Sequence, residues 1–87
     1  MQYTTFPSSN TLVTSNRSII HGFAIRATVT AVINIYDATS ATGTPIFRIS
    51  GPTTDTVFYD STKGIPFNNG IFIEIASGTA SGSIFWE

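Results

Sequence analysis

The sequence predicts a small, single-domain, all-β protein: an antiparallel β-sandwich or jelly-roll-like fold of about seven or eight short strands. Short runs of β-branched and aromatic residues are separated by clusters of Gly, Pro, Asn, Asp and Ser, at the spacing typical of a sandwich. No segment keeps apolar residues at helical spacing with good helix formers between them, and Leu12 is the only leucine. We therefore expect one β domain over residues 1–87.

The N-terminal half carries three predicted strands after a polar start. Residues 1–10 are expected to form a loosely held arm, because residues 7–10 have the composition of a loop. Gly22 lies within the strand expected over residues 18–27, and it predicts a bulge there or a point where a neighbouring group packs closely. Strands with alternating apolar and polar residues are expected over 11–14, 18–27 and 30–36.

Turn residues divide the C-terminal half. The Asp37 carboxylate can accept hydrogen bonds from backbone amides two or three residues further on, and Gly43 can adopt a positive φ. Asn69 and Gly70 form the strongest turn signal in the chain. These four residues are the predicted fold-determining turn positions. Strands are expected over 44–50, 55–60, 65–67, 70–76 and 82–87, with turns at 61–64 and 77–80.

The composition favours a protein that works within an assembly. Charged residues make up 10% of the chain and the net charge is -1, against about 25% charged residues in an average soluble domain. A domain of this size buries only about 60–65% of the surface of its unfolded chain. Because cysteine is absent, we expect stability to come from partners or from very regular packing.

Charge and hydropathy argue against two classes of partner. The four basic residues are scattered and roughly balanced by five acidic ones, so no basic stripe predicts direct binding of nucleic acid. The chain starts with neither a positive leader nor an apolar segment, and no apolar run approaches the ~20 residues of a membrane span. We therefore expect no membrane partner and synthesis as a soluble chain in the cytoplasm.

No catalytic, cofactor-binding or metal site is predicted. His21 is the only histidine, and no local motif supports a Ser-His-Asp triad around it. Asp55 and Asp60 would lie at opposite ends of one strand, which argues against a glycosidase pair. Turn stabilisation is the favoured role of Asp37 and Asp60, ahead of calcium binding. The predicted activity is therefore binding or assembly, without catalysis or a cofactor.

The aromatic residues leave two interpretations open. Most are expected to fill the core or an interface, while a carbohydrate-binding platform would require Trp86 to be exposed together with Tyr36 or Tyr59. The aromatic residues weighed for this platform are Tyr36, Phe58, Tyr59, Phe72, Phe85 and Trp86. The predicted assembly interface consists of apolar residues near the two ends of the chain: Tyr3, Phe6, Phe85 and Trp86.

Four segments in order carry a resemblance to a known family. They are residues 19–25, residues 35–46 with their Tyr-Asp turn, residues 67–71 with Asn-Asn-Gly, and residues 77–80 followed by an aromatic-ended strand. From about Ser18 to the end, the chain resembles the small β-sandwich decoration (cement) proteins of tailed bacteriophage capsids. In that family the Tyr-Asp turn joins two sandwich strands, so the resemblance implies that these segments determine the fold.

The resemblance also implies a structural role on the exterior of a virion. The expected function is to bind the major capsid protein at the outer capsid surface, as a homo-oligomer, and to stabilise the shell. Two alternatives stay open: another virion component, in a baseplate, tail or fibre, or a module that binds host glycans.

Overall fold

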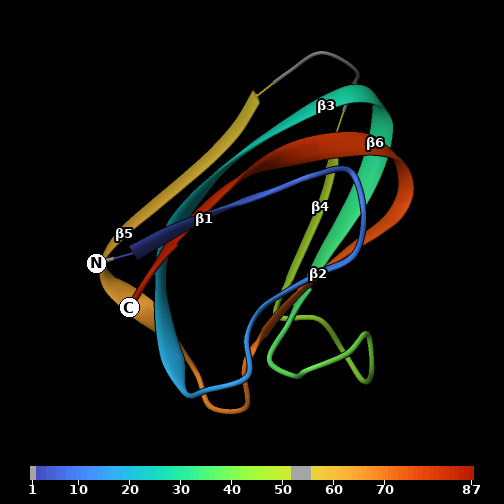
Figure 1. Cartoon of the computed structure of the whole chain (residues 1–87). Helices are drawn as coiled ribbons and strands as arrows, with labels where there is room; N and C mark the ends of the chain where they lie inside the picture. The colour runs from blue at the N-terminus through green and yellow to red at the C-terminus, as the bar shows by residue number, and fades with distance from the viewer. Residues whose placement is uncertain (1, 52–55) are drawn as a thin grey trace.

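A computed structural model shows an all-β domain that forms a small antiparallel sandwich. It describes residues 2–51 and 56–87, with the backbone alone at residues 27–30, 51 and 56–62. The predicted fold class is confirmed. The strands are β1 (Gln2–Phe6), β2 (Thr11–Thr14), β3 (Ser18–Tyr36), β4 (Phe47–Gly51), β5 (Thr56–Phe67) and β6 (Ile71–Trp86) (Figure 1).

A long antiparallel ribbon of β3 and β6 forms the centre of the sandwich. Its pairing runs from Ile20 opposite Trp86 to Tyr36 opposite Phe72. Strands β1 and β2 pair with the two ends of β6, and β5 and β4 pair with the two ends of β3. The ribbon bends in the middle, as Figure 1 shows. One sheet therefore provides both layers, with strand orders β1-β6-β3-β5 and β2-β6-β3-β4.

The predicted strand breaks in β3 and β6 are wrong, because the ribbon bends there without ending. Residues 18–27 and 30–36 belong to one strand, and so do residues 70–76 and 82–87 apart from the outermost residues. Successive shifts in register between Ala27 and Ile33 of β3 bend the pair without ending it. Gly78, with a φ of 75° as in a left-handed turn, lies in the facing part of β6.

A bulge replaces another predicted turn. The register moves from Ile20 opposite Ile65 to Gly22 opposite Asp60, so residues 61–64 of β5 extend past a single residue of β3. The polar turn sequence therefore makes an irregular part of β5 and does not end the strand. The bulge predicted at Gly22 is confirmed. Strand β4 begins later than predicted, at Phe47.

The start of the chain is an integral strand, which corrects the expectation of a loosely held arm. All five residues of β1 pair with β6 in an unbroken register, from Gln2 opposite Trp86 to Phe6 opposite Gly82. Phe6 is only 1% exposed and belongs to the core. The Trp86 indole N–H donates to Thr4 Oγ1 at 3.1 Å. Inward-facing side chains thus hold β1 in the sandwich.

The connection between β1 and β2 completes the edge of β6. Strand β1 pairs with β6 from Gly82 onward, and β2 pairs with β6 up to Ile73. Between these two stretches, the amide of Ala80 donates to Ser8 Oγ at 3.0 Å and the amide of Ile75 donates to Asn10 Oδ1 at 3.0 Å. Side chains of the connecting loop therefore replace a strand partner along the bend.

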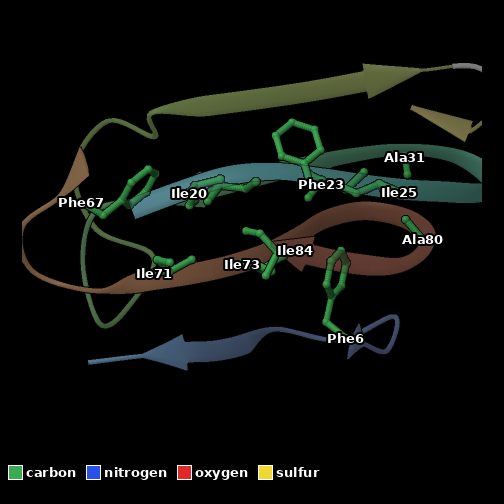
Figure 2. Close-up of a cluster of buried hydrophobic side chains, with 12 residues drawn as sticks. Phe6, Ile20, Phe23, Ile25, Ala31, Phe67, Ile71, Ile73, Ala80 and Ile84 are labelled. Atoms are coloured by element: carbon green, nitrogen blue, oxygen red, sulfur yellow. The ribbon is translucent and has the colours of Figure 1, made fainter. Parts of the chain in front are cut away.

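Isoleucine and phenylalanine side chains from both layers fill the interior. Figure 2 shows Ile20, Phe23 and Ile25 of β3 gathered with Ile73 and Ile84 of β6 in one buried cluster. The Phe47 ring packs edge-on against Phe23, with centroids 5.3 Å apart, and stacks on Phe67 at 6.5 Å. The largest fully buried side chains are Phe6, Phe67, Ile20, Ile25, Ile33, Ile35, Ile71, Ile73 and Ile84.

The predicted turn residues meet at one end of the sandwich. Gly43 has a φ of 74° and Gly70 a φ of 139°, so both predicted positive φ angles are confirmed. Asp37 acts differently from the prediction, because its Oδ1 accepts a hydrogen bond from the distant Asn69 amide at 2.7 Å. This bond joins the loop after β3 to the turn before β6. The carboxylate therefore links two turns.

We predict that Gly70→Ala destabilises the fold much more than Gly43→Ala. A Cβ at Gly70 would lie 2.6 Å from the backbone oxygen of Thr14, while a Cβ at Gly43 would meet nothing within 4 Å. We expect a loss of about 1–2 kcal/mol for Gly43→Ala, from its left-handed backbone alone, and about 3 kcal/mol or more for Gly70→Ala. Urea unfolding measures both, and equal losses would contradict the assignment.

Candidate assembly surfaces

The structure gives the four predicted interface residues different degrees of exposure: Tyr3 is exposed, Phe85 and Trp86 are half-buried, and Phe6 is buried. Tyr3 and Phe85 are cross-strand partners whose ring centroids lie 6.4 Å apart, and Tyr3 is 70% exposed. The prediction is therefore wrong in placing Phe6 at a surface, because strand alternation turns its side chain inward. Trp86 is half-buried, and its side chain packs against the core.

The Tyr3 and Phe85 pair lies on an outer face made of small, uncharged side chains. We call Tyr3 and Phe85 with their neighbours Thr5 and Ser83 the Tyr3–Phe85 surface. Thr5 and Ser83 are cross-strand partners whose hydroxyl oxygens lie 3.3 Å apart. Gly22 pairs with Phe85 from the other side. This surface offers aromatic and hydroxyl groups next to the free edge of β1.

A second apolar row, which the sequence analysis did not identify, crosses the outer face of the other layer. Leu12 pairs with Phe72, and Phe72 pairs with Tyr36. The row continues at Ile46, whose amide donates to the Ile35 carbonyl at 2.9 Å. Leu12 is 47% and Ile46 is 50% exposed. We call this row the Leu12–Ile46 surface.

A polar row runs beside the Leu12–Ile46 surface. Asn34 of β3 lies between Glu74 of β6 and Arg48 of β4 in the register. The Asn34 side-chain amide donates to Glu74 Oε1 at 2.9 Å, and the Tyr36 hydroxyl donates to the same oxygen at 2.8 Å. Asn34 and Tyr36 are both buried. Two buried donors therefore fix the position of a partly exposed carboxylate.

These hydrogen bonds shift the protonation equilibria of both partners. Donation from Asn34, and then from Tyr36, lowers the pKa of Glu74. The hydrogen bond to Glu74 is also the main cause that raises the pKa of Tyr36, followed by burial. Asn34 Oδ1 is buried and has no hydrogen-bond partner within the described part of the chain. At neutral pH, the row thus combines a carboxylate with the exposed cation of Arg48.

The remaining candidates for chemistry are His21 and the acidic side chains of the described residues. His21 Nε2 lies 2.6 Å from Glu87 Oε2, so the ring has a carboxylate partner at the end of the β3–β6 ribbon. Within residues 2–51 and 56–87, no group of three or more His, Cys, Asp or Glu side chains could hold a metal ion. Asp55 lies outside the described residues, as does the side chain of Asp60.

The aromatic platform required for glycan binding is not assembled from the described side chains. Tyr36 is only 7% exposed and donates its hydroxyl to Glu74. Trp86 packs against the core at the other end of the ribbon. The side chain of Tyr59 lies outside those that the structure describes. Tyr36 and Trp86 therefore do not form a shared exposed face.

Comparisons with known proteins add no relative: no family model matches the chain, and no curated protein or solved structure matches it. The described residues include no helix that is long and apolar enough to cross a membrane.

We predict that Glu74→Gln reduces the loss of stability on acidification. Because the folded-state pKa of Glu74 is lowered, its stabilising contribution is full above the unfolded-state pKa of about 4.3 and disappears as the pH falls through the folded-state value. The free energy of unfolding should fall more steeply for the wild type than for the variant below about pH 4.3. Urea unfolding at a series of pH values measures both curves, and parallel curves would contradict the assignment.

Proposed function

We propose that the protein is a structural component of a bacteriophage virion, a decoration protein that binds the outer surface of the capsid. The single observation that carries the proposal is the Leu12–Ile46 surface, an apolar row that crosses β2, β6 and β3, ends at Ile46 just before β4, and is exposed at both ends. The partner is the major capsid protein. The resemblance of the chain's turn segments to capsid decoration proteins supports the same assignment.

The energetics of this surface suit a contact that is repeated many times. Complete burial of one large aliphatic side chain contributes about 1.5–3 kcal/mol, and Leu12 and Ile46 are already about half buried. Each copy therefore gains only a modest contribution from these two residues. A symmetric shell presents the same site many times, and linked copies bind more tightly than single ones. Weak individual contacts are thus compatible with stable decoration.

The polar row adds orientation to the apolar contact. Interfaces combine an apolar centre with a polar rim that fixes the geometry of docking. Glu74 is held by Asn34 and Tyr36 before any partner arrives, and Arg48 is exposed on the neighbouring strand. A carboxylate that is already positioned loses little conformational entropy on binding. The row therefore favours one orientation of the domain on its partner.

Two other functions compete with this proposal. A baseplate, tail or fibre component would use the same sandwich and the same kind of apolar surface. A glycan-binding module would need exposed aromatic side chains gathered on one face, and Tyr36 and Trp86 do not provide them. A role in the virion is therefore favoured over glycan binding, and the capsid is distinguished from the tail by experiment.

We predict that Leu12→Glu and Ile46→Glu each weaken binding to isolated capsids at least about tenfold, because each places a charge in an apolar contact. Thr42→Glu is the matched control, since Thr42 is exposed in the loop before β4. Capsids that lack the protein are mixed with each variant, and the bound fraction is measured by sedimentation.

Thermal unfolding shows that each variant keeps its fold, and isolated tails are tested in parallel. Wild-type protein that binds tails and not capsids would transfer the function to the tail. Equal capsid binding by the wild type and both surface variants would contradict the assignment of this surface.

A further inference from the structure

We propose that the free edge of β1 pairs with β1 of a second copy of this chain, in an antiparallel arrangement about a two-fold axis. The two layers end at β1, β5, β2 and β4, each of which has one neighbour among the strands that the structure describes. An edge strand exposes backbone N–H and C=O groups along its outer side, and such groups can bind another strand. The four edges differ in how open they are to such pairing.

Three of the four edges carry features that oppose strand addition. Strand β2 has four residues and a shift in register between Leu12 and Thr14. Strand β4 carries the exposed cation of Arg48. Strand β5 contains a bulge, Lys63 and Pro66. Short length, charge, proline and bulges are the features by which sheet proteins protect their edges.

Strand β1 is short but lacks the other protective features. Its sequence, Gln-Tyr-Thr-Thr-Phe, contains no charged residue and no proline, and its five residues pair with β6 without a shift in register. A regular inner ladder gives the outer edge an equally regular row of backbone groups. Tyr and Thr also favour extended structure. Strand β1 is therefore the edge best suited to form a further ladder.

A second copy fits this edge better than a charged partner does. A two-fold axis at Thr4 would place Tyr3 of one copy opposite Thr5 of the other, twice in the same interface. Both side chains are exposed on the outer face, and a pair of an aromatic and a β-branched side chain stabilises neighbouring strands. Because β1 is uncharged and the whole chain has a net charge of -1, two copies meet little electrostatic repulsion.

The pairing joins the β1-containing layers of two copies into one continuous sheet. It leaves the Leu12–Ile46 surface of each copy free, because that surface belongs to the other layer. A five-residue edge is a small interface, so we expect weak association in solution. The inference does not rest on capsid binding, and its test uses the purified protein alone.

The test compares self-association of the wild type with that of charge variants. Sedimentation velocity up to about 1 mM protein should show a monomer and dimer equilibrium for the wild type. Y3K/T5K would place lysines opposite lysines, and Y3E/T5E would place glutamates opposite glutamates, so each variant alone should be monomeric. An equal mixture of the two should dimerise, because every facing pair then has opposite charges.

A matched control adds the same charge elsewhere. S40K/T42K carries its lysines on exposed residues of the loop before β4, and it should associate as the wild type does. Wild-type protein that stays monomeric at about 1 mM would overturn the inference. The same holds if Y3K/T5K associates like the wild type, or if the mixture of the two charge variants stays monomeric while both are folded.

A measurement on the wild type alone keeps the inference testable if the variants do not fold. Amide chemical shifts recorded over the same concentration range should change along Gln2–Phe6, as expected for a new ladder at that edge. Changes that centre on Leu12 and Ile46, with none in β1, would show that a different surface associates and would overturn the inference.

Discussion

Antiparallel pairing between β3 and β6 holds every other strand of the protein in place, because β1, β2, β4 and β5 each pair with only one of these two. The chain has no cysteine, so no disulfide adds to this pairing. Isoleucines of the ribbon line both sides of the interior. The bend brings the two ends of the ribbon face to face, and one sheet thereby encloses a core.

The register of the ribbon also determines what each outer face presents. Since successive strand residues point to opposite faces, a slip of one residue would exchange buried and exposed side chains. The observed register places Phe72 beside Leu12 and Glu74 beside Asn34 on the outside. The same alternation places Phe85 outside and Trp86 inside. Core and candidate assembly surfaces are therefore two consequences of one strand pairing.

Local patterns in the sequence predicted the fold class, the bulge at Gly22, and the turn at Asn69 and Gly70, because these depend on alternation and backbone conformation. Patterns of this kind could not show that β1 belongs to the sheet, since one large inward residue in a threonine-rich segment is a weak signal. Nor could they place Leu12 and Ile46 at the two ends of one row, because that row depends on the register of β2, β6 and β3. Whether a turn-like segment ends a strand or only bends it also depends on pairing with residues far away in the sequence, as in β3 and β6.

We expect the bent ribbon to make both layers one cooperative unit. Native-state hydrogen exchange tests it directly, by comparing amides of the ribbon in the first layer, such as Phe23 and Ile84, with amides in the second, such as Ile35 and Ile73. The account predicts that all of them exchange through global unfolding, with the same free energy and the same dependence on denaturant. Exchange of one layer at a distinctly lower free energy would show that the layers unfold separately, and would contradict the claim.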